Sequence, residues 1–352
     1  MDTLTHGLAG AVLARTSTGR LAARAALFTG LVAAMLPDLD ILFLRTRLDY
    51  LRFHRGWTHS FLVLPVFALA VALLTRLVFR GARLAMLWLF AAIGIGSHIL
   101  FDWITSFGTM FFFPLSRTRY SLDWVFILDP IFSGIAAATL LATVVFRARG
   151  RAVAAAGAAT LAAYIALCAA LHARALEAWR RADRPPAGAH VAALPQFLSP
   201  FRWLGLSDHP DSVHAGFFDI GPFARGVADP QPPRHLSEIL RSLSDFYPPP
   251  DRMMIRRFPN PPPSAALEAA RALPDVEGYL QFTRFPRATV RAAPDGSTVI
   301  VWEDLRFLPW FAGPWQVNGR GVLQRRPFLY RVRLDATGRA VESAVVNTFH
   351  LP

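Results

Sequence analysis

The chain contains no lysine, so all 37 of its basic side chains are arginines. Together with the many alanines, this pattern indicates a general Arg/Ala bias of composition. The formal net charge of +13 would suggest nucleic-acid binding in a soluble protein. Bare charge is a weak signal, however, and much of it falls in short turns between hydrophobic runs. We therefore expect no nucleic-acid partner.

Cysteine is almost absent as well. The single one, Cys168, lies inside the apolar run 152–171, which excludes an intramolecular disulfide and leaves a small apolar residue. Residues 1–14 have no cationic leading region, and their apolar stretch carries Asp2 and His6, so we expect no cleavable signal peptide. Insertion into a membrane would then depend on the hydrophobic helices themselves.

Hydrophobic residues make up 53% of the chain, and its mean hydropathy is +0.34. This is more apolar than a soluble protein requires, so we expect a membrane protein. The apolar residues are concentrated before Arg174, whereas the remainder is mixed, Pro-rich and polar. We predict an integral membrane domain at residues 1–172 and an extramembrane domain at residues 173–352.

The membrane domain is predicted to be mainly α-helical. A helix needs about 20 apolar residues to cross a bilayer. The apolar runs that approach this length are residues 21–36, 61–79, 84–104, 131–146 and 152–171. Residues 3–14 form a further helix that, at about 1.5 Å per residue, is too short to cross alone. We therefore predict about five transmembrane helices plus an N-terminal half-helix.

The arginines predict an orientation in the cell (inner) membrane. If all five runs span, the turns on one side contain only basic charged residues, and that side should be cytoplasmic. These residues are Arg15, Arg20, Arg24, Arg76, Arg80, Arg83, Arg147, Arg149 and Arg151. The opposite face, which carries the candidate site described below and residues 173–352, would be extracytoplasmic.

The C-terminal domain shows a different periodicity. Alternating stretches rich in β-branched and aromatic residues predict strands at residues 214–220, 278–285, 298–307 and 328–334. Turn sequences at 294–296 and 335–338 separate some of them. Two short helices are predicted at residues 236–244 and 264–273. The pattern indicates a small α+β domain with a mainly antiparallel sheet.

Acidic and histidine side chains gather at the ends of the hydrophobic runs, where ionisable groups are costly and usually functional. His98 and Asp102 are four residues apart, so a helix places both on one face at a spacing that suits metal ligation. Asp38 and Asp40 follow a hydrophobic run that Pro37 interrupts. The alternatives are a His/Asp pair that only hydrogen-bonds and a solvated turn that caps a helix.

The loop that enters the next run adds His54 and His59 around a glycine, with Arg55 able to grip a phosphate with two hydrogen bonds. His54 could instead be an interfacial residue. His6 alone would be a core histidine, but a half-helix descending from the same face would bring it beside the aspartates. Arg117 lies in a later loop on this face, where its alternative role is contact with lipid headgroups.

Five stretches together resemble the YdjM-like family of predicted membrane-bound metal-dependent hydrolases. They are residues 1–7, 37–40, 54–60, 97–102 and 113–116. Residues 304–307 also resemble a strand of the C-terminal domain in longer members. The order of His and Asp residues is further similar to zinc-dependent phospholipase C and P1-type nucleases.

The resemblance implies a set of metal ligands, with Asp102 as the bridging candidate: His6, Asp38, His59, His98 and Asp102. Asp40 and His54 are less certain members and, with Arg55 and Arg117, are candidate catalytic residues. The chain lacks the N-terminal tryptophan and the second His-x3-Asp/Glu pair of those soluble enzymes. One or two divalent ions, most simply Zn²⁺, are therefore expected.

The predicted function is that of a membrane-bound metal-dependent hydrolase whose metal-activated water attacks a phosphodiester or phospholipid-type substrate. Membrane lipids are the expected partners, because the site lies where headgroups are. The alternative is a non-enzymatic membrane protein with a structural metal and a partner-binding C-terminal domain. A transporter fits less well, because the ligands gather at helix ends and not at the bilayer midplane.

Overall fold

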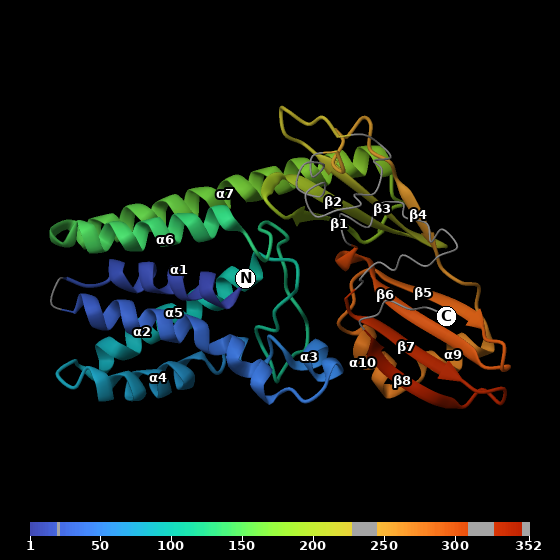
Figure 1. The fold of residues 1–352 in the computed structure, drawn as a ribbon, viewed down its shortest axis with the longest axis horizontal. Coiled ribbons are helices and arrows are strands. Elements are labelled where there is room, and N and C mark those ends of the chain that lie inside the picture. The colour runs from blue at the N-terminus through green and yellow to red at the C-terminus, as the bar shows by residue number, and fades with distance from the viewer. Residues whose placement is uncertain (20–21, 227–244, 309–326, 347–352) are drawn as a thin grey trace. The chain divides into compact units, whose positions relative to one another are not determined.

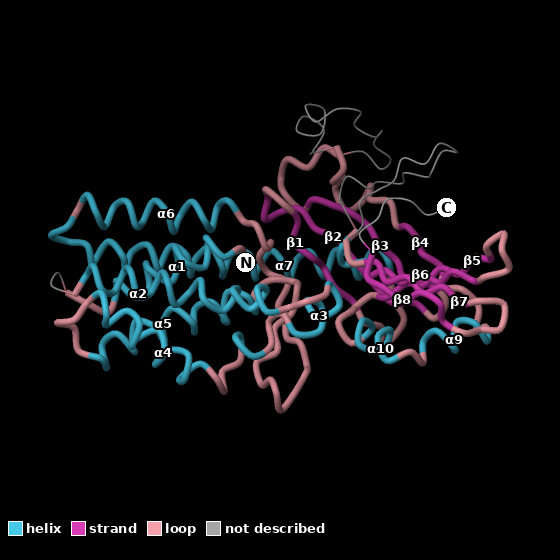
Figure 2. The backbone as a smooth tube through the Cα atoms, turned by 60° about the horizontal axis from the view of Figure 1, so that its bottom comes forward, coloured by secondary structure: helices cyan, strands magenta, loops and turns pink. Residues whose placement is uncertain are grey.

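The computed structural model describes residues 1–19, 22–226, 245–308 and 327–346. They form two compact units (Figures 1 and 2). The helical unit comprises Met1–Arg45 and Phe53–Ala170, and the sheet unit comprises Thr46–Arg52 and Leu171–Pro352. The short segment Thr46–Arg52 thus belongs with the C-terminal part of the chain, although both of its flanks belong to the helical unit.

Each helix expected from the hydrophobic runs is present in the helical unit. The helices are α1 (Thr3–Thr16), α2 (Ala23–Met35), α4 (Leu64–Val78), α5 (Leu84–Trp103), α6 (Pro130–Val145) and α7 (Gly150–Asp183). Asp129 caps α6, because its Oδ1 accepts from the backbone amides of Ile131 and Phe132, both at 2.9 Å. The sequence did not predict the short helix α3 (Arg47–Phe53).

Among the described residues, three helical stretches are long and apolar enough to cross a membrane: Ala23–Phe43, Leu84–Trp103 and Arg147–Asp183. A fourth crossing results if Arg47–His59 and Leu64–Val78, which are bent by 75° relative to each other, count as one broken span. The fifth expected span corresponds to α6, which has only 16 residues and is a shorter apolar helix than the three candidate spans above. The structure therefore supports three to four spans by length and composition.

Helices α4 and α6 expose large apolar side chains along one side. The residues are Leu69, Leu73, Leu74, Leu77 and Val78 on α4, and Leu141, Val144 and Val145 on α6. Contiguous apolar surface of this kind is rare in a soluble monomer. Lipid chains are the solvent in which such faces are stable, as expected for the membrane domain.

Small residues allow α1, α2 and α5 to pack closely. A Cβ atom on Gly10 would lie 2.4 Å from the Cβ of Ala34, and one on Gly94 would lie 2.7 Å from the carbonyl oxygen of Gly30. Only glycine fits such close backbone approaches, which are typical of helix pairs in membranes. The contact also brings the end of α2 beside α5, where the candidate site lies.

Helix α7 is longer than predicted, because it continues from residue 171 to Asp183. Its 34 residues extend about 50 Å, well beyond the roughly 30 Å of a hydrocarbon core. The added turns belong to the sheet unit. There Trp179 is fully buried and packs over Gly205 and Gly216, where any side chain would collide with the indole ring.

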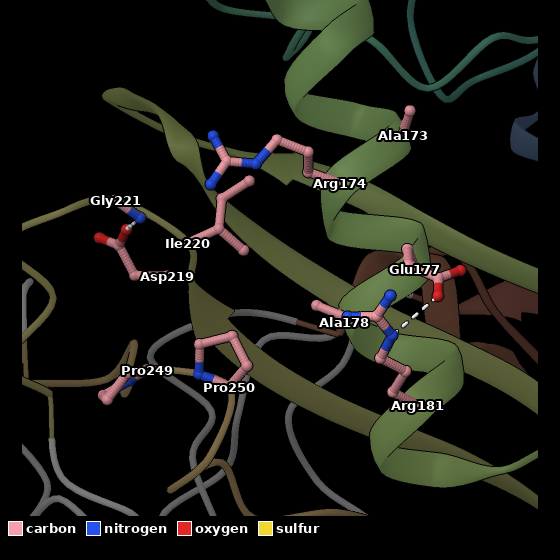
Figure 3. A pocket seen from close by; sticks show the side chains of 10 residues that line it. All are labelled: Ala173, Arg174, Glu177, Ala178, Arg181, Asp219, Ile220, Gly221, Pro249 and Pro250. Atoms are coloured by element: carbon pink, nitrogen blue, oxygen red, sulfur yellow. Dashed lines mark hydrogen bonds and ion pairs between the residues drawn. The ribbon is translucent and has the colours of Figure 1, made fainter.

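A cavity of about 570 Å³ lies beside these turns of α7 (Figure 3). Arg181 on its wall pairs with Glu177 at 2.8 Å, and Asp219 Oδ1 accepts from the amide of Gly221 at 2.7 Å. These charged groups are thus engaged within the protein, and we assign no ligand to this cavity.

The sheet unit contains two antiparallel four-stranded sheets where a single sheet was expected. The first consists of β1 (Val191–Gln196), β2 (Ser199–His209), β3 (Ser212–Asp219) and β4 (Arg256–Pro259). The second consists of β5 (Pro286–Ala292), β6 (Thr298–Asp304), β7 (Leu329–Leu334) and β8 (Ala340–Val346). Neighbouring strands pair in sequence order in both sheets. The predicted strands at 214–220, 298–307 and 328–334 correspond to β3, β6 and β7.

The predicted strand at 278–285 is wrong. Residues Pro274–Leu280 form helix α10, in which proline begins the first turn and Val276 and Tyr279, three residues apart, are both buried. The helix predicted at 264–273 is confirmed as α9 (Ala265–Arg271), with Ser264 as its N-cap. The helix predicted at 236–244 lies outside the described residues.

Candidate metal centre

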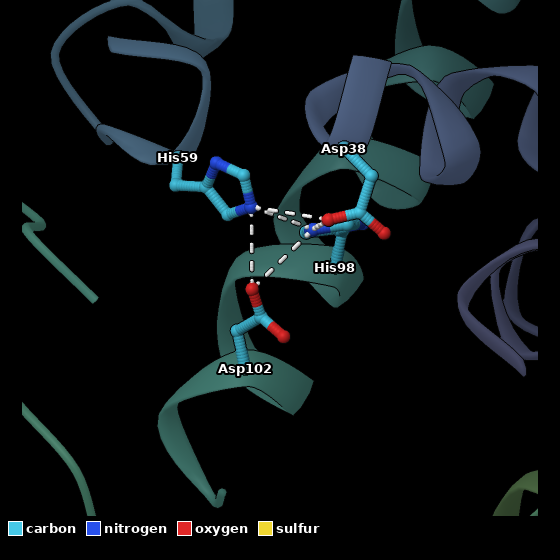
Figure 4. Close-up of side chains that lie close together, drawn as sticks. All are labelled: Asp38, His59, His98 and Asp102. Carbon is cyan, nitrogen blue, oxygen red and sulfur yellow. Dashed lines mark hydrogen bonds and ion pairs between the residues drawn. The ribbon is translucent and has the colours of Figure 1, made fainter. Parts of the chain in front are cut away.

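Four of the predicted ligands converge inside the helical unit (Figure 4). They are Asp38, His59, His98 and Asp102. Asp38 lies in the 3-10 helix that follows α2, where Pro37 ends regular α-helix. His59 ends the short 3-10 helix before α4, and the other two lie one turn apart on α5. All four are buried.

The donor atoms are separated as a tetrahedral metal ion requires. The Nε2 atoms of His59 and His98 lie 2.9 Å apart. They are 3.6 and 3.5 Å from Asp38 Oδ1, and 3.2 and 3.5 Å from Asp102 Oδ2. Tetrahedral bonds of about 2.1 Å place ligand atoms about 3.4 Å apart. The four side chains, which we call the cage, therefore have the dimensions for one Zn²⁺-like ion.

Hydrogen bonds behind the two histidines determine which nitrogen faces the cage. His98 Nδ1 lies 2.6 Å from the carbonyl oxygen of Ala34, which can only accept, so Nδ1 carries the proton. Thr58 donates its hydroxyl proton to Asp40 at 3.3 Å and therefore accepts from His59 Nδ1 at 2.9 Å. In the neutral rings both Nε2 atoms then present lone pairs, which repel each other at 2.9 Å unless a cation lies between them.

The two oxygens of Asp102 have different surroundings. Oδ2 faces the histidines of the cage and, although buried, has no hydrogen-bond partner among the described residues. Oδ1 accepts from Arg55 Nη2 at 2.9 Å and from His6 Nε2 at 3.1 Å, and it contacts the amine of Met1. A buried oxygen without a hydrogen bond is costly, and a metal ion would satisfy it. The residues present therefore fit a divalent metal ion.

His6 and Arg55 lie beside the cage and not in it. The His6 ring stacks on His98 with 3.6 Å between centroids and reaches Asp102 from the Oδ1 side. The guanidinium of Arg55 is buried, and its Nη1 donates to Thr105 Oγ1 at 3.1 Å. Arg55 was predicted to bind phosphate, but its observed contacts instead hold the Asp102 carboxylate in position.

Asp40 and His54 form a separate pair next to the cage. Asp40 Oδ1 accepts from His54 Nδ1 at 2.8 Å, and both side chains are largely buried. The same carboxylate accepts a hydrogen bond from the hydroxyl of Thr58. Because this hydroxyl also bonds to His59 Nδ1, Thr58 connects Asp40 to His59. The pair resembles the Asp–His arrangement in which a carboxylate orients an imidazole for proton transfer.

The structure does not bring Arg117 to the cage. Its side chain is exposed, and its guanidinium lies 5.9 Å from the ring centroid of Phe53. Arg119, which lies in the same loop and on the same predicted face as Arg117, donates to the carbonyl oxygens of His54 at 3.2 Å and of Gly108 at 3.1 Å. These hydrogen bonds hold in place the loop that carries His54, which is the hydrogen-bond partner of Asp40.

Other contributors had no signal in the sequence. Thr3 donates to Asp38 Oδ2 at 2.7 Å, and Ala34 acts through its backbone carbonyl. Thr58 lies between His59 and Asp40 and forms a hydrogen bond with each. Such roles depend on where two segments meet, which residue spacing does not reveal.

The helical unit contains apolar candidate spans and a buried centre of two imidazoles and two carboxylates. These features define the class of the protein, which is a membrane protein with a site able to hold a metal ion. Within this class, residues 1–175 match the YdjM inner membrane protein family. This half of the chain belongs to that family, as its motifs predicted.

Two curated relatives are similar to the chain. The inner membrane protein YbcI of Escherichia coli (strain K12) is 36% identical over 102 residues, which are 28% of this chain and 58% of YbcI. The uncharacterized protein YfhP of Bacillus subtilis (strain 168) is 28% identical over 138 residues, or 37% of this chain and 42% of YfhP. The chain thus spans about half the length of these relatives. No solved structure matches it.

Proposed function

We propose that the protein is a membrane-bound metal-dependent hydrolase that acts on a phosphodiester or phospholipid-type substrate at the membrane surface. The observation that supports this most directly is the cage, in which two imidazole lone pairs and two carboxylates converge in a buried site. Mixed nitrogen and oxygen donors in tetrahedral positions favour Zn²⁺. A divalent ion there would act as a Lewis acid and lower the pKa of water toward about 7.

The side chains around the cage take distinct roles in this proposal. Arg55 is a positioning residue, because it keeps the Asp102 carboxylate turned toward the histidines. The Asp40–His54 pair is assigned to proton transfer beside the ion. Arg117 is exposed and suited to contact the anionic headgroup of a lipid. Membrane lipids are the proposed partners, because α4 and α6 of the unit that carries the cage expose large apolar side chains.

We also propose that the cage opens outside the cytoplasm, on the same side as the C-terminal residues. If α6 also spans, the arginine-only turns all lie on one side of the membrane and support this orientation. The shared side depends on the same five spans, which would leave residues 45–59 and the residues after 172 on one side of the membrane.

A structural metal site is the second candidate, and the number of donors favours it. Four protein ligands close a tetrahedral ion, as in structural zinc sites, whereas catalytic sites keep one position open. In the hydrolase, Asp38 is the ligand that must yield this position, since its side chain is 11% exposed while the other three are fully buried.

One experiment on the detergent-purified protein distinguishes the catalytic metal site from the structural one. Bound metal is quantified, and hydrolysis is measured on a panel of phosphodiesters and phospholipids. In a hydrolase, His98→Ala loses the metal held by the cage together with turnover, whereas His54→Ala retains that metal and loses turnover. Metal-loaded protein that cleaves nothing on the panel would favour the structural role. Full metal content in both His98→Ala and Asp102→Ala would refute the cage itself.

A further inference from the structure

A second group of metal-type side chains lies in the sheet unit, independent of the cage. It consists of Asp183, His209 and His214. Asp183 is the last residue of α7, where the carbonyl end of the helix adds negative potential. His209 ends β2, and His214 lies on β3. We call these three side chains the strand-helix cluster.

The sheet register explains why they meet. On β2, Ser207 and His209 are two residues apart and share a face, and Ser207 pairs directly with His214 across the ladder. The same face carries Gly205 opposite Gly216, on which Trp179 packs. Asp183 is one helical turn beyond Trp179 and therefore reaches the same face.

The contacts within the cluster are short and directed. Asp183 Oδ2 lies 2.9 Å from His209 Nε2, and its Oδ1 lies 2.6 Å from His214 Nδ1. Ser207 donates its hydroxyl to the same carboxylate. The side chain of Asp183 is only 2% exposed, and among the described residues it pairs with no arginine. The buried negative charge of Asp183 is therefore stabilised by His209, His214 and Ser207.

We propose that the strand-helix cluster binds a divalent metal ion of the Zn²⁺ class and so fastens the end of α7 to the sheet. One carboxylate and two imidazoles are a common set of three protein ligands for such ions. The two carboxylate–imidazole distances need to lengthen by only about 0.5 to 0.8 Å to reach the roughly 3.4 Å spacing of a tetrahedral site.

The two imidazole rings lie together beside the Asp183 carboxylate. The rings of His209 and His214 stack face to face, with 3.6 Å between their centroids and 20° between their planes. One ligand atom from each of the three side chains lies within 4.8 Å of the other two. A divalent ion among them would balance the buried negative charge of Asp183.

A cavity gives an ion access to the cluster. His209 lines a space of about 600 Å³ whose wall also carries Asp208, Asp211 and Glu268, with Arg271 as a basic member. An excess of carboxylates raises the local concentration of cations. The same opening allows water to complete the coordination of an ion held by three protein ligands.

The test uses the full-length chain in detergent, with the cage disabled by His59→Ala and His98→Ala. Zinc is titrated against a chromophoric chelator, and bound metal is counted after desalting. We expect one equivalent of Zn²⁺ to remain in this background. His209→Gln or His214→Gln should then weaken zinc binding at least tenfold. His190→Ala is the matched control, because His190 is a histidine of the same unit outside the cluster, and it should leave binding unchanged.

Absence of bound zinc in the cage-disabled protein would overturn the proposal, and so would undiminished binding in both glutamine variants. If the cage-disabled chain does not fold, the otherwise wild-type chain provides the measurement. There His209→Gln combined with His214→Gln should remove one equivalent of zinc, and an unchanged stoichiometry would overturn the proposal. Hydrolase activity plays no part in these readouts, so failure of the proposed function leaves the test intact.

Discussion

Substitution of Thr58 by valine tests how the cage is built, because it removes one hydroxyl and nearly preserves side-chain shape. In the structure, Thr58 accepts from His59 Nδ1 at 2.9 Å and donates to Asp40 at 3.3 Å. The first bond keeps the His59 proton on Nδ1, so that Nε2 presents its lone pair to the cage. The equivalent partner of His98 is the backbone carbonyl of Ala34, which no substitution can remove.

Loss of such an outer hydrogen bond typically weakens metal binding 10- to 100-fold. For Thr58→Val this corresponds to about 1.4 to 2.8 kcal/mol of binding free energy. The assay is competition for Zn²⁺ between the detergent-purified protein and a chelator of known affinity. His209→Gln is included in every protein compared, so that a second site does not mask the effect.

Thr29→Val is the matched control. Thr29 is buried in α2 of the same unit, but its hydroxyl oxygen has no hydrogen-bond partner among the described residues. The control should therefore bind zinc as tightly as the parent protein. If Thr58→Val also binds as tightly as its parent, His59 does not ligate through Nε2 in the way argued. An equal loss in both variants would indicate a general loss of packing instead.

Two further predictions concern packing and topology. Gly30→Ala should lower the melting temperature in detergent, because its Cβ would lie 2.6 Å from the Cβ of Ala14 and overpacking costs about 1–3 kcal/mol. Gly134→Ala is the control and should leave the melting temperature unchanged, because a Cβ there meets nothing within 4 Å. Equal melting temperatures of the two variants would contradict this account. In a Cys168→Ala background, cysteines at Arg47 and Ala336 should react alike with a membrane-impermeant thiol reagent in intact cells, both labelled if the proposed orientation holds. Labelling of one alone would exclude a shared side.

The helical half of the fold was predictable because the bilayer imposes a simple rule on sequence. Long apolar runs mark helices, and their observed ends differ from the predicted ones by only a few residues for all but one. The exception is α7, which continues through residues 172–183. Alanine, leucine, glutamate and arginine there are strong helix formers, but they no longer form a continuous apolar run. Hydropathy therefore marked where the lipid-like composition ends and not where the helix ends.

The sheet half was harder, because short apolar segments are ambiguous between strand and helix. Residues 278–285 contain aromatic residues that favour a strand, yet Pro274 begins a helix that buries Val276 and Tyr279. Strands such as β2 pass through Gly205, which sequence rules disfavour. That glycine is present because Trp179 occupies the space above it, and this contact joins segments far apart in the chain.

The candidate site was predictable to the extent that its spacing is local. His98 and Asp102 share a helix face by virtue of being four residues apart, whatever the fold. Asp38 and His59 were suggested by their positions at the ends of apolar runs, and the structure places both in the cage. The direction of Arg55 could not be inferred, because a guanidinium suits a phosphate and a carboxylate equally well. Only the fold placed Asp102 within its reach.

Arg55 also bears on the choice between a catalytic and a structural ion. A buried arginine that binds Oδ1 leaves only Oδ2 of Asp102 for the cage, so this carboxylate could ligate one ion and not two. The cage then has four donors, of which Asp38 alone has access to solvent. In the proposed hydrolase, a substrate would approach from the side of Asp38, whose other oxygen accepts a hydrogen bond from Thr3. Whether that single carboxylate can move aside is what separates a hydrolase from a structural metal site.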